Sequence, residues 1–231
     1  MPYTVSHIGW DIGIAAVAIL GVALFRRMRP AAFPVRIAIA ALLVAFELQR
    51  FFTVHVAFPN QMPFYLCNVS TWAAVLACLT LNPLAIDFLY FNGLAAAIMA
   101  LIMPDMGSAW PASFFMNHAG IVLAASVLVF GRIVRMRPVY PLRAFGMILV
   151  YFSLGALFDW RFGTNYSFMM HKPSGPSLMD LLGPWPWYWL SVAILDNFLI
   201  WLLWLPVRSQ RPETAIRAAG SRAAFRAAAG S

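Results

Sequence analysis

The chain has 231 residues, of which 62% are hydrophobic and 10% are charged. Soluble domains carry roughly 25% charged residues, so this composition excludes an ordinary soluble protein and indicates a membrane protein. The net charge of +8 does not indicate nucleic-acid binding, because the basic residues form separate clusters rather than one patch. Two cysteines are too few for a disulfide framework, and Cys67 and Cys78 lie ~16 Å apart along one apolar segment, so we expect free thiols.

Apolar runs long enough to cross ~30 Å of hydrocarbon recur along the whole chain. We expect seven transmembrane helices, at roughly 8–25, 33–57, 63–81, 84–103, 113–134, 142–160 and 185–207. The links between them are short, except for residues 161–184, which are rich in Gly, Pro and Ser. The sequence therefore predicts an all-α fold, a polytopic bundle of seven spans.

The basic residues predict the orientation of this bundle. Thirteen of the 16 fall at the first link, at the fifth link and in the tail: Arg26, Arg27, Arg29 and Arg36; Arg132, Arg135, Arg137 and Arg143; Arg208, Arg211, Arg217, Arg222 and Arg226. With seven spans, all three clusters lie on one side, which the positive-inside rule makes cytoplasmic. We expect the N-terminus outside and the C-terminus in the cytoplasm, with a membrane domain at 1–207 and a basic tail at 208–231.

Polar residues inside the spans fall at two depths. Cys67 and His118 lie about 6 and 7.5 Å below the outer boundary of two parallel spans, so their side chains meet if these spans pack together. Glu47 and Arg50 share one face of the second span, and they lie with Asp196 near the midplane, about 15 Å down. Ionisable groups there cost at least ~2.5–3.5 kcal/mol unless paired, so we expect Arg50 to pair with a carboxylate.

These residues also have structural interpretations. A buried cysteine is usually a small hydrophobic residue, which is our expectation for Cys78. A lone histidine often bonds a neighbouring helix, and the Glu47–Arg50 pair can be structural. Cys67, His118 and His55 are candidate metal ligands, but their spacing matches no metal motif, so we expect no metal or other cofactor. No GxSxG or P-loop motif occurs.

Three motifs follow one another along the chain: MPFYLCNVSTW, MNHAGIVLA and GTNYSFMMHKPSGPSLMDLLGPWPWY. Over roughly residues 40–207 the chain resembles the YwaF-like family of bacterial integral membrane proteins. Eukaryotic relatives of that family resemble membrane-embedded acyltransferases that load an acyl chain onto lyso ether-phospholipids, using a Cys nucleophile and a His. The resemblance matches Cys67 and His118 to these two residues. It implies a multi-pass protein of the bacterial inner (cell) membrane whose partner is a membrane lipid.

The first functional hypothesis is a Cys-dependent acyltransferase that acts on a phospholipid or lysophospholipid near the outer leaflet. Cys67 would attack an ester carbonyl and His118 would carry the proton. With water as the acceptor, the same chemistry is that of a lipid hydrolase. Substrate-binding residues are expected in the first turn of the third span and in the long sixth link: Asn68, Arg161, Asn165, Tyr166 and Lys172.

The second hypothesis is a transporter or a lipid- or ligand-binding membrane protein without covalent chemistry. In this case Glu47, Arg50 and Asp196 would be substrate or proton sites near the midplane. His55, near the outer end of the second span, is expected to be a supporting residue. A structural or regulatory membrane protein is a third alternative. A thioester on Cys67 separates the first hypothesis from the other two.

Overall fold

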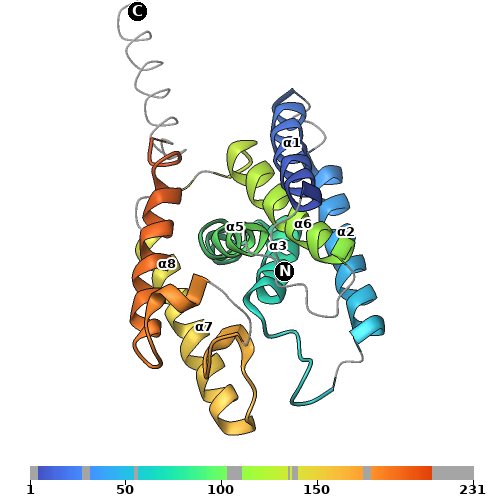
Figure 1. Ribbon diagram of the computed structural model, residues 1–231. Helices are drawn as coiled ribbons and strands as arrows, with labels where there is room; N and C mark the ends of the chain where they lie inside the picture. The colour runs from blue at the N-terminus through green and yellow to red at the C-terminus, as the bar shows by residue number, and fades with distance from the viewer. Residues whose placement is uncertain are drawn as a thin grey trace, which may run out of the picture.

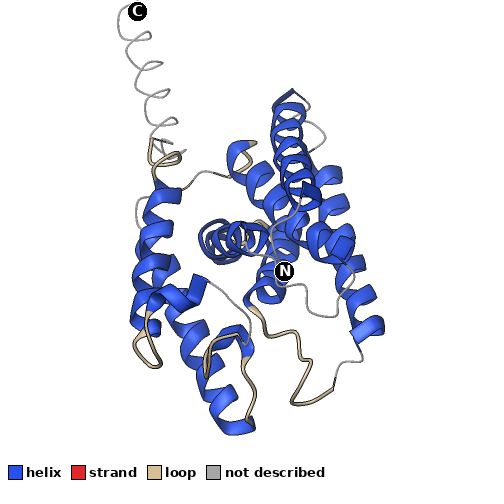
Figure 2. Cartoon of the chain, in the orientation of Figure 1, coloured by secondary structure: helices blue, strands red, loops and turns tan. Residues whose placement is uncertain are grey.

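The computed structural model describes residues 5–27, 32–54, 57–102, 111–134, 136, 140–173 and 178–209. Every regular element in these ranges is helical (Figure 2). They are α1 (Val5–Arg27), α2 (Ala32–Val54), α3 (Leu66–Thr80), α4 (Pro83–Asp87), the π-helical turn η2 (Phe88–Gly93), α5 (Leu94–Ile102), α6 (Pro111–Phe130), α7 (Tyr140–Phe162), the 3₁₀ turns η3 (Tyr166–Phe168) and η4 (Leu178–Leu182), and α8 (Tyr188–Trp204). The all-α prediction is confirmed, and each of the seven predicted runs contains a helix, with α4, η2 and α5 joined in one.

Among the described residues, four helical segments are long and apolar enough to cross a membrane: His7–Arg27, Pro83–Ile102, Ala112–Phe130 and Pro141–Phe162. α3 and α8 are shorter apolar helices. α2 has 23 residues but contains Arg36, Glu47 and Arg50. These features indicate a membrane protein. That it has seven spans, and which way they face, remain predictions from the sequence.

The helices are arranged around α3, α5 and α6, with α1 and α2 on one side and α7 and α8 on the other (Figure 1). α1 runs parallel to α6, because Trp10 stacks on Phe115 near the start of both helices and Arg26 Nε donates to the Phe130 carbonyl at their ends. α2 and α3 are antiparallel, because Arg36 near the start of α2 bonds the Cys78 carbonyl near the end of α3, whereas Glu47 near the end of α2 bonds Asn68 at the start of α3.

The relative direction of α3 and α6 follows from α2. Gly120 lies against Leu43, while Val127, further along α6, shares a hollow with the earlier α2 residues Val35 and Ile39. α2 is therefore antiparallel to α6 as well as to α3. It follows that α3 and α6 are parallel, as the topology predicted from sequence requires.

On one side of the bundle, several arginine side chains donate hydrogen bonds to groups at the ends of neighbouring helices. Arg36 Nε donates to the Cys78 carbonyl at the end of α3, at 2.7 Å, and Arg143 Nε donates to Asp87 Oδ2 of α4, at 2.6 Å. We call this side, where Arg26, Arg27, Arg36 and Arg143 lie, the basic end. Arg161 lies at the opposite end of α7, which we call the Cys67 end because α3 begins there.

The π-helical turn positions two buried polar residues. Tyr90 Oη donates to the Leu203 carbonyl of α8 at 2.9 Å, and Asn92 Nδ2 donates to the Ala144 carbonyl of α7 at 3.2 Å. A π-turn displaces side chains from α-helical positions. Here it directs these two groups toward α7 and α8, which it ties to the central helices.

Candidate functional site

Cys67 lies in the first turn of α3, on the face of the helix that points into the bundle. Thr71, Ala74 and Cys78 continue the same stripe, and all three are completely buried. Cys67 itself is half-buried. The thiol therefore lies at the positive end of the helix dipole, in the turn whose backbone N–H groups begin α3.

A loop from another part of the chain holds the start of α3. Tyr65 is the N-cap residue and its side chain makes no capping bond. The cap comes instead from Ser167, whose Oγ accepts from the Leu66 backbone N–H at 3.2 Å and lies 2.6 Å from Tyr151 Oη. Tyr151 Oη also donates to the Phe64 carbonyl at 2.8 Å. The segment that carries Cys67 is thus positioned by α7 and by the loop that follows it.

The predicted ion pair of Glu47 and Arg50 is confirmed and lies next to the thiol. Arg50 Nε donates to Glu47 Oε2 at 3.1 Å, and Asn68 Nδ2 donates to Glu47 Oε1 at 3.0 Å. Glu47 is 5% exposed, and both it and Arg50 are in electrostatic range of Cys67. Asn68, expected to bind substrate, uses one amide N–H to orient this carboxylate.

This arrangement differs from the depths expected from sequence, which placed Glu47 much deeper than Cys67. The reason is that residues 57–65 are not helical and α3 begins only at Leu66. The non-helical segment 57–65 therefore runs from the end of α2 down to the level of Glu47, where α3 begins. Glu47 is seven residues from the end of α2, so Cys67 lies about 10 Å below that end.

His118 is buried on α6, and one of its ring nitrogens is unused. Nδ1 lies 2.7 Å from the Phe114 carbonyl, whereas Nε2 is buried without a hydrogen-bond partner. Thr71 Oγ1 lies 3.1 Å from Asn117 Oδ1, which sets the register of the parallel helices α3 and α6. This register places His118 about five residues, ~7.5 Å along the helix axis, deeper than Cys67. The two residues are on adjacent helices, but His118 does not hydrogen-bond to Cys67.

The predicted substrate-binding residues of the loop lie at the Cys67 end, but two of them are engaged within the protein. Asn165 Oδ1 accepts from the backbone N–H groups of Met170 and His171, and its Nδ2 donates to the His171 carbonyl. Tyr166 Oη donates to the Pro59 carbonyl at 2.8 Å and accepts from the Met62 N–H at 2.7 Å. Burial raises the pKa of this phenol.

The two cations of this loop region remain accessible. Arg161 is exposed, with its guanidinium 5.2 Å from the centre of the Phe162 ring. Lys172 is half-buried, with Nζ 5.8 Å from the centre of the Tyr188 ring. His55 lies outside the described residues. Within the described ranges, no group of three or more His, Cys, Asp or Glu side chains is placed to hold a metal ion.

Asp159 and Asp196 each have a buried carboxylate oxygen without a hydrogen-bond partner. Asp159, which was not among the site residues predicted from the sequence, accepts from Thr164 Oγ1 at 2.5 Å and from the Tyr166 N–H at 3.0 Å through Oδ1, while Oδ2 has no partner. Its signal in the sequence is a carboxylate four residues before Gly163, the first residue of the GTNYSF motif. Asp196 Oδ2 is also unpartnered. Asp196 is not brought to Glu47, because α8 packs on α5, α7 and η2, whereas α2 packs on α3 and α6.

The chain matches one family model over nearly all of its helices. The model is that of the TMEM164 family, and it covers residues 2–205. No curated protein and no solved structure matches the chain. The matched range includes Cys67, His118 and the whole helical bundle, so the chain belongs to the TMEM164 family, a family of membrane proteins.

Proposed function

We propose that this protein is a membrane-embedded enzyme that transfers acyl chains between lipids, with Cys67 as the nucleophile. The observation that carries the proposal is the position of the sulfur in the first turn of α3, next to Asn68, which bonds the Glu47–Arg50 pair. A helix N-terminus and a nearby cation are the surroundings in which a cysteine reacts as thiolate. A backbone N–H of this first turn is also suited to bind the oxyanion formed on the acyl adduct of the sulfur.

The thiol also needs a base, because one neighbouring charge favours the thiolate and another opposes it. The buried carboxylate of Glu47 opposes a second negative charge beside it, whereas Arg50 favours one. His118 is the proposed base, since its Nε2 is buried and free of hydrogen bonds. His118 does not hydrogen-bond to Cys67, so the proton transfer would need water between them or a closer approach of α3 and α6.

The reaction has two balanced steps. In the first, His118 takes the Cys67 proton and the sulfur attacks the carbonyl carbon of a lipid ester. The carbon–oxygen bond then breaks, and the leaving lysolipid alkoxide takes the proton from the imidazolium. In the second, His118 removes a proton from the acceptor hydroxyl, the acceptor oxygen attacks the thioester, and the thiol is restored with the returned proton. Water in place of the acceptor lipid gives hydrolysis.

The charges at the Cys67 end support a phosphorylated lipid as substrate. Arg50 is partly exposed, and Arg161 and Lys172 lie at the same end of the bundle, where a phosphate head group would meet them. The proposal includes the seven-span topology, with the N-terminus outside, in the cell membrane. In this orientation the Cys67 end faces the outer leaflet.

The experiment is to incubate the purified protein with a phospholipid that carries a labelled acyl chain and to detect the acyl group on the protein. We expect one acyl group on Cys67 that neutral hydroxylamine releases, because a thioester is cleaved by this reagent. Cys67→Ala should remove the label. Cys78→Ala is the matched control, since Cys78 lies on the same stripe of α3 but is completely buried. Acyl transfer by folded Cys67→Ala protein at the wild-type rate would disprove the proposal.

Transport or ligand binding without covalent chemistry is the second candidate. The observation that favours it is the buried, unpartnered oxygen of Asp196 on the apolar helix α8, because ionisable groups inside membranes often mark substrate or proton sites. The two candidates separate in one comparison. A transporter would lose flux with Asp196→Asn and keep it with Cys67→Ala. An acyltransferase would lose acyl transfer with Cys67→Ala and keep it with Asp196→Asn.

A further inference from the structure

An apolar furrow runs along α1, on the side that faces α2 and α6. Its larger part has a volume of about 490 Å³ and is lined by Gly9, Trp10, Gly13, Ile14, Val17, Leu42, Met116, Ala119, Gly120 and Leu123. A smaller part of about 120 Å³ shares Leu123 and is lined also by Gly21, Leu24, Phe25, Val35, Ile39 and Val127. The lining positions of α1 recur at intervals of about four residues. The two parts therefore follow one face of the helix.

The furrow is separate from the Cys67 site. Met116 and Gly120 line the furrow, whereas Asn117, between them, faces Thr71 of α3. Successive helical positions are about 100° apart, so the furrow and the Cys67 site lie on different faces of α6. The inference below does not rest on the proposed acyl transfer.

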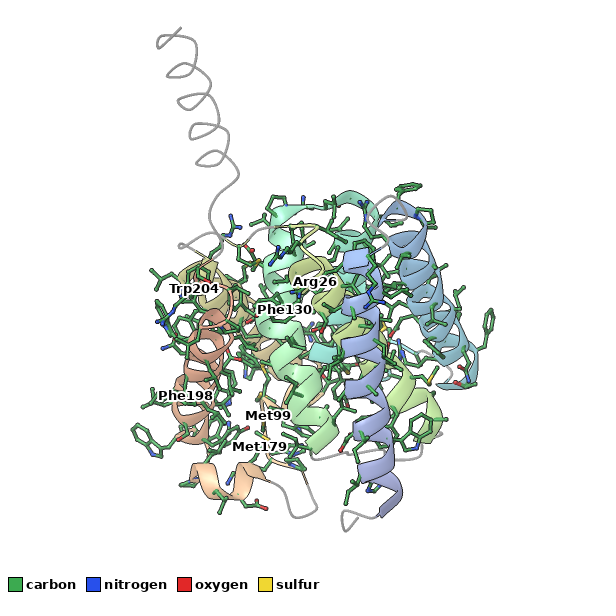
Figure 3. The ribbon with its side chains drawn as sticks, turned by 90° about the horizontal axis from the view of Figure 1, so that it is seen from above. Arg26, Met99, Phe130, Met179, Phe198 and Trp204 are labelled. Carbon is green, nitrogen blue, oxygen red and sulfur yellow. The ribbon has the colours of Figure 1, made fainter. Side chains whose placement is uncertain are left out.

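The smaller part of the furrow opens at the basic end of the bundle. Arg26, labelled beside Phe130 in Figure 3, donates through Nε to the Phe130 carbonyl at 2.8 Å, which fixes its stem at the end of α6. Arg27 is exposed. Arg36 adds a third positive charge on α2, although its guanidinium bonds the last carbonyls of α3. An apolar channel therefore ends at a cluster of cations.

We propose that the furrow binds one anionic phospholipid, with its phosphate on Arg26 and Arg27 and an acyl chain along α1 from Phe25 toward Gly13. The twelve residues between these positions span about 18 Å, slightly more than half of the ~30 Å hydrocarbon core. This is the reach of one acyl chain from one leaflet. A Cβ added at Gly9 or Gly13 would meet nothing within 4 Å, so the far part of the furrow is open to the chain. At Gly21, between the two parts, a Cβ would lie 2.7 Å from Leu123 Cδ1, so the Leu123 side chain separates them and turns aside for a chain that occupies both.

Charge complementarity favours a lipid over a second copy of the protein. Glycines spaced as Gly9 and Gly13 often mediate contacts between membrane helices. A parallel pair joined along this face of α1 would bring Arg26 and Arg27 of both copies together. Like charges destabilise such a contact, whereas a lipid phosphate neutralises the same cluster.

The first test measures head-group selectivity. Native mass spectrometry of the purified protein with phosphatidylglycerol or phosphatidylcholine should show one tightly retained phosphatidylglycerol. Arg26→Gln/Arg27→Gln should weaken its binding about tenfold to thirtyfold, because each arginine near a lipid surface contributes about a factor of five. Arg208→Gln is the matched control, since this exposed arginine lies beyond α8, on the other side of the molecule from α1 (Figure 1). Equal retention of the two lipids by the wild type would overturn the proposal.

The second test fills the furrow without changing its charge. Gly13→Leu should reduce phosphatidylglycerol retention at least fivefold, while Gly146→Leu should leave it unchanged. Gly146 is the matched control because it is also an exposed helical glycine with open space around it, but on α7. Cys67→Ala should also leave retention unchanged, which separates this site from the proposed enzyme. Lipid retention by Gly13→Leu at the wild-type level, or a wild-type dimer that this variant dissociates, would reject the lipid site.

Discussion

Two buried carboxylates at opposite ends of the bundle each meet an arginine, but they do so differently. Asp87 is fully buried and binds Arg143 of α7, with Nε at 2.6 Å from Oδ2, so the pair joins two helices that are distant in sequence. Glu47 binds Arg50 of its own helix and uses its other oxygen to accept from Asn68, next to Cys67. One pair fastens the fold, and the other orients polar groups beside a candidate nucleophile.

The difference shows that the same chemical pair has different consequences in different surroundings. Removing one partner of a buried ion pair leaves an unpaired charge in an apolar environment, which is costly. At the basic end this cost should appear as lost stability alone. At the Cys67 end it should appear in stability and also in acyl transfer.

Of the variants that test this contrast, we expect His118→Ala, at the Cys67 end, to have the largest effect, which is a loss of acyl-transfer rate. We expect acyl transfer to fall by a factor of ~10²–10⁴, because this is the usual contribution of a general acid–base residue. The variant loses only the contact of Nδ1 with the Phe114 carbonyl, since Nε2 has no partner, and folding is checked before the rates are compared. Initial rates with a labelled phospholipid would measure the effect, and His171→Ala in the loop is the control. An unchanged rate in the folded His118→Ala protein would exclude its role as the base.

The second effect concerns the basic end. Asp87→Ala should destabilise the protein by at most about 3–5 kcal/mol, because it removes the fully buried carboxylate that pairs with the partly exposed Arg143. The midpoint of thermal unfolding in detergent measures the change. Asp87→Ala/Arg143→Leu should recover part of the loss, and the folded fraction should transfer acyl chains at the normal rate. A specific loss of activity in stable Asp87→Ala protein would break the contrast between the two ends.

The third effect is smaller and tests the coupling of Glu47 to Arg50. Glu47→Gln and Arg50→Leu should each cost up to a few kcal/mol, and the double variant should lose less than the sum. We expect a coupling energy of roughly 0.5–3 kcal/mol from the double-mutant cycle, as for residues in contact. Strictly additive shifts in the unfolding midpoint would show that the two side chains do not stabilise each other.

The smallest effect is expected from Ser167→Ala, which removes the cap on the Leu66 N–H. Loss of an N-cap costs typically ~1 kcal/mol, and the start of α3 should become more mobile. Maleimide labelling of Cys67 should therefore become faster in Ser167→Ala, with Cys78 as the internal reference. Unchanged labelling and stability would show that the loop after α7 does not position Cys67.

Much of the helical framework was predictable from the sequence. The apolar runs predicted helices at the positions where the structure has them, because a backbone in lipid must satisfy its hydrogen bonds internally. The runs were less informative about helix ends. The predicted span at 63–81 begins as a helix only at Leu66, and the one at 185–207 only at Tyr188. The π-helical turn at Phe88–Gly93 had no sequence signal, since its displaced residues gain partners on α7 and α8 only in the folded bundle.

The sequence by itself determined the all-α class and the membrane composition, because these depend on local periodicity. It also determined the Glu47–Arg50 pair and the position of the described arginines Arg26, Arg36 and Arg143 at one end, because charge inside lipid is costly. Only the tertiary structure decided which groups surround Cys67. Ser167 lies 101 residues from the Leu66 amide that it caps, and Glu47 lies 21 residues from Asn68. The physical reason is that residues 57–65 do not form a helix, so helical spacing could not place Cys67 at the level of Glu47 and above His118.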